Sequence, residues 1–211
     1  SESAAKPERV AEWKVVRRAK VEKVSDIAVE DKDLAAKKTF PHPGFYLIGI
    51  ALTPSFIELS PRDFEQYLTE EKADAALASF KRRSTPDAPA REIYTKFAKT
   101  WVTIGEPAKD TSVHQAVGHL LEIIPTSDPR TWTSGMEVEV RVALEGQPVS
   151  GVHVSSGYEG LQAHTFAEQV VTDANGLARL TFAKGGHWYI RTHLIRPLAG
   201  PRAATAAPDA P

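Results

Sequence analysis

The fold of this chain is decided first by residues 136–144, which read MEVEVRVAL. Apolar residues occupy every second position from Met136 to Val142, and glutamates and an arginine stand between them. Because successive side chains of a β-strand point to opposite faces, this alternation predicts a strand with one buried face and one face in water. Turn signals follow at residues 146–148 (GQP) and at residues 173–176 (DANG), and the second is typical of a hairpin.

The rest of the second half of the chain also has the sequence pattern of short β-strands. Short apolar or alternating runs recur between turn residues, at 120–124, 149–155, 165–171, 178–182 and 188–194. About seven short strands with regular turns are typical of a β-sandwich. We therefore expect an immunoglobulin- or transthyretin-like sandwich over residues 113–197.

The first half combines strands with a short helical insertion. Residues 45–52 (FYLIGIAL) predict a strand that is buried on both faces. Ser60 suits a helix N-cap and Pro61 suits the first helical position. Two apolar stripes follow that lie nearly opposite each other at 100° per residue. One straight helix would bury both sides, so we predict a break near residues 70–72 and two short helices.

The best domain boundary is the polar stretch at residues 105–112 (GEPAKDTS). The predicted fold is mainly β, with two β-sandwich domains. The first covers residues 8–105 and carries the helical insertion at about 60–83, and the second covers residues 113–197. The Ala/Pro-rich tail at 198–211 has little apolar surface to bury, so it is expected to be disordered or extended.

Composition excludes several classes of function. The 211 residues carry a formal net charge of -1, which gives no electrostatic case for binding nucleic acid. There is no cysteine, so disulfides and thiolate metal sites are excluded. No apolar run approaches the ~18–20 residues of a membrane span, so direct membrane insertion is not expected. No signal peptide is present in these residues.

Histidines are the main candidates for chemistry. Six of the seven lie at or beyond the predicted boundary: His114, His119, His153, His164, His187 and His193. Strand alternation places His153, His187 and His193 on outward faces, where neighbouring imidazoles can share a transition metal ion. The spacing matches no compact ligand motif, and hydrogen-bonded or solvated surface histidines are the simpler interpretation.

Catalysis is not expected. The sequence has no phosphate-binding loop, no GxSxG elbow and no HExxH motif. Tyr158, Tyr189, His153 and His193 supply the residue types with which intradiol dioxygenases hold iron on a related scaffold. The signature spacing of those enzymes is missing, so we predict a non-catalytic protein.

Several blocks in order resemble one family of proteins. They include PGFYLIGI at 43–50, GHLLEIIPTSDP at 118–129 and GQPVSGV at 146–152, and the match spans about residues 8–197. The chain is similar to bacterial periplasmic proteins of unknown function that are linked to nickel uptake. The resemblance implies an exported, periplasmic protein that handles or delivers a transition metal such as nickel or cobalt. A glycine expected between the two helices is replaced near Lys72.

Two hypotheses follow. The first is an accessory protein for metal uptake that serves a membrane transporter, with His153, His187 and His193 as the ligands. The second is a structural or protein-interaction subunit of a larger assembly, which binds no metal and docks through an exposed strand edge. Convergence of the histidines would favour the first hypothesis, and an apolar patch beside an unpaired edge would favour the second.

Overall fold

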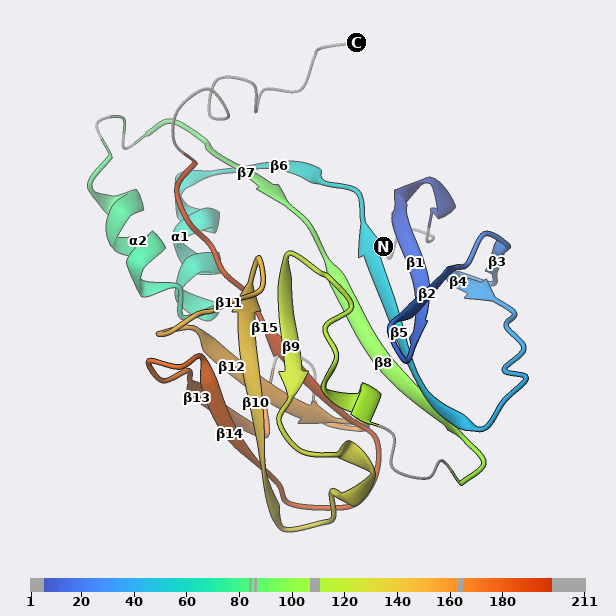
Figure 1. The fold of residues 1–211 in the computed structure, drawn as a ribbon. Coiled ribbons are helices and arrows are strands. Elements are labelled where there is room, and N and C mark those ends of the chain that lie inside the picture. The colour runs from blue at the N-terminus through green and yellow to red at the C-terminus, as the bar shows by residue number, and fades with distance from the viewer. Residues whose placement is uncertain (1–5, 84, 86, 107–110, 163–164, 199–211) are drawn as a thin grey trace. The chain divides into compact units, whose positions relative to one another are not determined.

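The computed structural model describes residues 6–83, 85, 87–106, 111–162 and 165–198 (Figure 1). These residues contain fifteen strands, two α-helices and three short 3-10 helices, which confirms the prediction of a mainly β protein. Contacts group the chain into two compact units. Unit 1 combines the chain up to Thr53 with Lys96–Thr192, and unit 2 combines Pro54–Thr95 with the chain from His193 onward.

The first sheet of unit 1 has the strand order β2-β1-β5-β8, and all neighbours are antiparallel. Its strands are β1 (Val10–Arg17), β2 (Lys20–Lys23), β5 (Gly44–Leu52) and β8 (Phe97–Ile104). The strand predicted to be buried on both faces is β5, where Phe45, Tyr46 and Leu47 are all at most 5% exposed. This prediction is confirmed for the first half of the strand.

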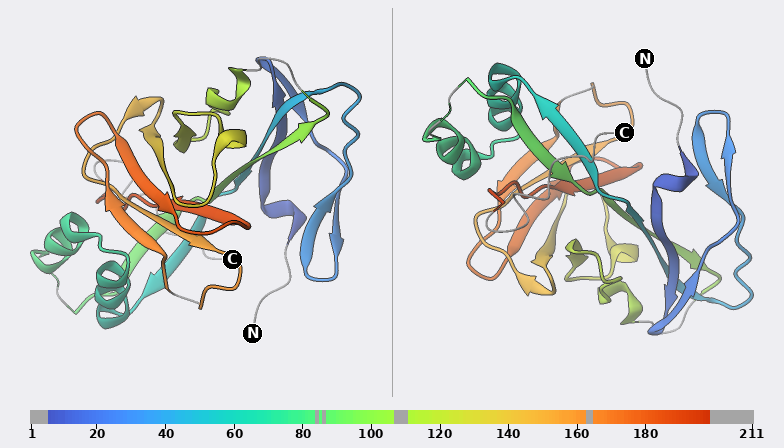
Figure 2. Two further views of the ribbon diagram at one scale, coloured as in Figure 1. Left: turned by 90° about the horizontal axis from the view of Figure 1, so that it is seen from below. Right: turned by 90° about the horizontal axis from the view of Figure 1, so that it is seen from above.

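A small hairpin lies beside β1 in both views of Figure 2. It consists of β3 (Ile27–Glu30) and β4 (Asp33–Ala36), and it follows the 3-10 helix η1 (Pro7–Arg9) and strands β1 and β2 along the chain. Asp31 takes a positive φ of 57° at the tip, a conformation that Asp tolerates better than most residues.

The remaining strands of unit 1 form two sheets that share one hydrophobic core. One sheet contains β9 (Leu121–Pro125), β10 (Met136–Leu144), β11 (Gln147–Pro148) and β14 (Leu177–Phe182), and the other contains β12 (His153–Tyr158), β13 (Glu168–Val171) and β15 (Trp188–Thr192). Val138, Val140 and Val142 are fully buried in that core, as the alternation of residues 136–144 predicts. An immunoglobulin- or transthyretin-like arrangement of these sheets stays a prediction.

The turn at residues 173–176 corrects one prediction. The Asp173 side chain accepts hydrogen bonds from the N–H groups of Asn175 (2.8 Å) and Leu177 (2.9 Å), and Gly176 has a φ of 72°. The tight turn is therefore present, but it joins β13 to β14, which belong to different sheets. The hairpin prediction was wrong because turn chemistry fixes the local bend and not the partner of the following strand.

Unit 2 contains the two predicted helices and a two-stranded sheet. Its elements are β6 (Ser55–Leu59), α1 (Pro61–Glu70), α2 (Asp74–Lys81) and β7 (Ala90–Tyr94). The Ser60 hydroxyl accepts a hydrogen bond from the Asp63 N–H at 3.1 Å, which confirms the N-cap. The predicted break is also confirmed, and Lys72 takes a φ of 53° between the helices.

Aromatic side chains connect the first sheet of unit 1 with the sheets that follow it. The Trp101 ring stacks on Phe45 at 6.3 Å and meets Trp132 edge-on at 6.1 Å, and Trp132 in turn meets Phe182 at 5.5 Å between centroids. Trp132 follows the 3-10 helix η3 (Pro129–Thr131). Contacts thus place strands from both sides of the predicted 105–112 boundary in one unit. The ranges 8–105 and 113–197 stay predictions, and residues 107–110 and 199–211 lie outside the described chain.

Candidate functional site

The predicted ligands His153 and His187 lie at opposite ends of β12. His153 begins β12, whereas His187 precedes Trp188, which pairs with Tyr158 at the other end of that strand. Five residues of extended chain cover about 17 Å. Imidazole nitrogens bind a transition metal ion at about 2.0–2.1 Å, so this arrangement does not bring the two rings to one ion.

The third predicted ligand, His193, belongs to unit 2. Its Nδ1 lies 3.1 Å from a carboxylate oxygen of Glu71, and its Nε2 lies 2.8 Å from the Glu71 carbonyl oxygen. Both ring nitrogens are therefore engaged with acceptors at the end of α1. Within the described ranges, no three His, Asp or Glu side chains gather into a group that could hold a metal ion. His164 lies outside those ranges, and the nickel or cobalt site stays a prediction.

The outer edge of β8 is the first candidate binding site, because backbone groups along it can pair with another strand. The Leu52 N–H donates to the Lys96 carbonyl oxygen at 2.9 Å, and the register continues without a shift along β8. In an antiparallel pair, the N–H and C=O of one residue point to the same side and alternate along the strand. The peptide groups of Thr100 and Val102 therefore point toward β5, and those of Trp101 and Thr103 point away from it. Among the described residues, β8 pairs with β5 alone.

The second half of this edge carries no charged side chain. Residues 100–104 read TWVTI and carry no Lys, Arg, Asp, Glu or Pro. Trp101 remains 37% exposed although its ring contacts Phe45 and Trp132. An uncharged, proline-free stretch of an edge strand is a template on which another strand can pair.

The opposite edge of the same sheet is guarded. Strand β2 has four residues, all exposed, and three of them are charged. Glu22 forms an ion pair with Lys38 beside it. Short length and charged side chains are the usual means by which proteins protect a sheet edge from unwanted pairing.

A buried polar cluster supports β8 from inside. Lys14, Gly49 and Lys99 are direct neighbours across β1, β5 and β8. His119 packs over Gly49, and its side chain contacts the Phe97 ring at 5.1 Å between centroids. We define the His119 cluster as Glu12, Lys14, Lys99, His119 and Glu122.

Glu122 has the most complete set of partners in this cluster. Its carboxylate accepts hydrogen bonds from the N–H groups of Val117 (2.7 Å), Gly118 (3.0 Å) and His119 (3.1 Å). It also accepts one from the Lys99 ammonium group at 2.6 Å. Burial raises the pKa of Glu122, but Lys99 and these hydrogen bonds outweigh that effect and lower the pKa below its ordinary value.

Burial also governs the two basic groups of the cluster. Desolvation lowers the pKa of Lys99, and the Glu122 carboxylate opposes part of that shift. Desolvation lowers the pKa of His119 as well; Glu122 opposes that shift, while Lys14 and Lys99 add to it. The arrangement therefore favours a neutral imidazole beside two ion pairs, Lys14–Glu12 and Lys99–Glu122.

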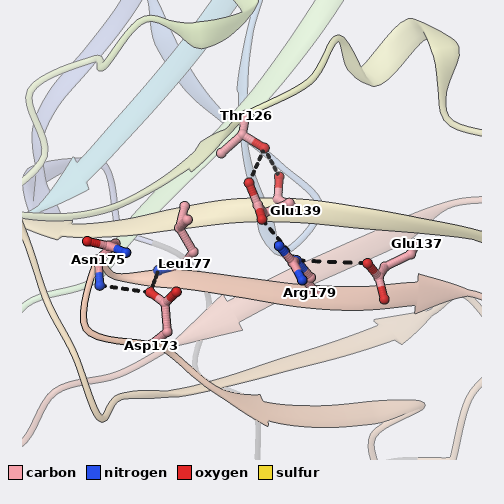
Figure 3. A network of polar contacts seen from close by, with 7 residues as sticks. All are labelled: Thr126, Glu137, Glu139, Asp173, Asn175, Leu177 and Arg179. Atoms are coloured by element: carbon pink, nitrogen blue, oxygen red, sulfur yellow. Dashed lines mark hydrogen bonds and ion pairs between the residues drawn. The ribbon is translucent and has the colours of Figure 1, made fainter.

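A second polar network lies on the exposed face of β10 and β14 (Figure 3). Arg179 contacts Glu139 at 3.0 Å and Glu137 at 3.9 Å, and the Thr126 hydroxyl donates to the Glu139 carbonyl oxygen at 2.9 Å. The hydrogen bond that Arg179 donates to the Glu139 carboxylate raises the pKa of Arg179. Such exposed ion pairs contribute little to stability. We therefore interpret this network as part of the solvent-exposed strand face that the sequence predicts.

The chain belongs to the family described as "Domain of unknown function (DUF4198)", whose pattern matches residues 2–196. No curated protein and no solved structure matches the chain. Among the described residues, no helix is long and apolar enough to cross a membrane.

Proposed function

We propose that the chain is a non-catalytic protein-interaction module that binds an extended segment of a partner protein along the outer edge of β8. The observation that carries this proposal is the outer edge of β8, which is uncharged in its second half and unpaired among the described residues. The peptide groups of Trp101 and Thr103 point away from β5, and residues 100–104 carry no charge. The periplasmic location implied by the family resemblance is part of this proposal.

Strand addition supplies both affinity and selectivity at such an edge. Each backbone hydrogen bond gives a net gain of about 0.5–1.5 kcal/mol. The partially exposed Trp101 ring can add an aromatic anchor, because Trp is over-represented among the residues that dominate binding energy. The partner is therefore expected to be a segment of a larger assembly that presents an extended backbone with an apolar side chain opposite Trp101.

Site-specific photo-crosslinking in cells that produce the full chain tests this proposal. A benzoylphenylalanine at the exposed Thr100 position is expected to give a discrete cross-linked product. The same group at Val21, which is 61% exposed on the guarded edge, is the matched control and is expected to give none. Identical products from both positions, or no product from Thr100, would contradict docking at β8.

Metal handling is a second candidate, and one specific observation favours it. The exposed His187 ring lies 3.2 Å through Nδ1 from a carboxylate oxygen of Glu159, so an imidazole and a carboxylate already stand together. Two such ligands bind a transition metal ion loosely, and a partner would supply the others. Calorimetric titration with Ni(II) and Co(II) tests this candidate. Binding that His187→Ala loses and His153→Ala keeps would support it, and no binding would reject it.

A further inference from the structure

The His119 ring packs directly against the backbone of Gly49, where an added Cβ atom would crowd it. A Cβ atom on Gly49 would lie 3.1 Å from His119 Nε2 and 3.0 Å from Val117 Cγ2, closer than nine in ten real Cβ contacts. His119 is 7% exposed, and its ring packs against Phe97. The imidazole therefore holds residues 117–119 against the face of the sheet, directly over the middle of β5.

The ring is placed where a second proton would have no acceptor. His119 Nε2 is buried and has no hydrogen-bond partner in the part of the chain that the structure describes. A neutral imidazole can leave that nitrogen as an unprotonated acceptor, but an imidazolium carries N–H groups on both nitrogens. A buried donor without an acceptor is expensive, and a buried charge without a partner is more so.

The charges around the ring are already paired with one another. Lys14 and Glu12 face it from β1, Lys99 faces it from β8, and Glu122 faces it from β9. Lys14 and Lys99 each lie 2.6 Å from their own carboxylate. Protonation of His119 would therefore add a third cation to a cluster of two balanced pairs, with no carboxylate left to receive it.

We propose that His119 is an acid-sensitive latch: the neutral ring holds the segment from Val117 to Glu122 on the β1-β5-β8 face, and protonation releases it. This inference goes beyond the proposed docking function and does not depend on it. The latch also bears on β8, because the Lys99–Glu122 ion pair joins β8 to the start of β9 in the same segment.

The direction of the pH dependence follows from the cause of the pKa shift. Burial lowers the pKa of His119 in the folded chain, whereas the unfolded chain titrates near the ordinary value of about 6.5. The stabilisation by the neutral ring is therefore complete above about pH 6.5 and is lost as the pH falls toward the lower folded value. Over that interval the folding equilibrium constant falls by at most about tenfold per pH unit.

Urea unfolding of the full chain from pH 7.5 to pH 5.0 tests the latch, because the ordinary pKa values of carboxyl groups, about 3.9–4.3, lie below that range. The wild type is expected to lose more stability on acidification than His119→Gln, which cannot gain the proton. His187→Gln is the matched control, since the His187 side chain is 92% exposed, and it should follow the wild type. Parallel pH profiles for His119→Gln and the wild type would overturn the proposal.

Hydrogen exchange of the wild-type chain gives an independent readout if His119→Gln does not fold. The N–H groups of Val117, Gly118 and His119 all donate to Glu122, so they report on the latched segment. Their protection is expected to fall between pH 6.5 and pH 5.0, while that of Val140 in the main core persists. Equal persistence at all four positions would reject the latch.

Discussion

The two edges of the β2-β1-β5-β8 sheet differ in how they are protected against pairing with another strand. The β2 edge is short and charged, and its Lys38–Glu22 pair is exposed, with the Glu22 side chain 66% accessible. Strand β8 is twice as long as β2, and its second half, residues 100–104, carries no charge. Its Lys99–Glu122 pair is buried on the inner face of the sheet. Exposed charged side chains therefore protect the β2 edge from pairing, whereas the charged pair at β8 is buried and stabilises the strand without covering its edge. A sheet that guards only one edge keeps the other available for pairing.

Removal of one carboxylate at each edge should give the largest difference. Glu122→Gln leaves the buried Lys99 ammonium group without a counterion, so the free energy of unfolding is expected to fall by about 3–5 kcal/mol. Glu22→Gln breaks an exposed pair and is expected to cost at most about 1 kcal/mol. Urea denaturation at pH 7.5 measures both. Equal losses would mean that the two ion pairs do not differ as the structure indicates.

The close packing at Gly49 allows a sharper test of how β8 is supported. Gly49→Val places a branched side chain against His119 and Val117, and it should lower the free energy of unfolding by about 1–3 kcal/mol. Gly185→Val is the control, because no atom lies within 4 Å of the position of its added Cβ. Thermal unfolding of both variants measures the difference. Tolerance of valine at Gly49 would show that His119 does not fill the space as described.

The sequence predicts the strands and helices better than it predicts their partners. The alternation in residues 136–144, the Ser60 cap and the helix break near Lys72 all follow from local rules, and all three are confirmed. The turn at residues 173–176 is also a local feature, but its strands pair elsewhere because sheet pairing depends on distant residues.

The candidate site shows the same limit. Histidine density drew attention to His153, His187 and His193, whereas the imidazole that is buried within the described ranges belongs to His119. Lys14, Gly49 and Lys99 become neighbours only through the registers of β1, β5 and β8, which the sequence does not specify. The unguarded run TWVTI at 100–104 does carry a signal, because an uncharged, β-rich stretch without proline can be recognised from its residue types alone.

Proline substitutions at matched positions separate docking from stability. Thr103→Pro removes an N–H that points away from β5, so partner cross-linking from Thr100 is expected to fall about tenfold with little change in unfolding. Val21→Pro is the control on the other edge. The Val24 N–H donates to the Trp13 carbonyl oxygen, so by alternation the Val21 N–H also points outward. Loss of cross-linking in both variants would remove the distinction between the edges.

The smallest effect is expected in unit 2, at the turn between the two helices. Lys72 has a φ of 53°, which glycine adopts at lower cost than lysine. Lys72→Gly is expected to change the free energy of unfolding by less than about 1 kcal/mol, toward stabilisation, because strain relief exceeds the added entropy of the unfolded chain. Thermal unfolding and cross-linking from Thr100 should be measured together. A change in cross-linking would mean that docking is not confined to β8.

Amide hydrogen exchange along β8 tests the central claim most directly. In the isolated chain at neutral pH, the N–H groups of Thr100 and Val102 should be protected by β5, whereas those of Trp101 and Thr103 should exchange rapidly. This alternation is what an open edge requires. If Trp101 and Thr103 are protected as strongly as Thr100 and Val102, the edge is already covered, and docking by strand addition at β8 is contradicted.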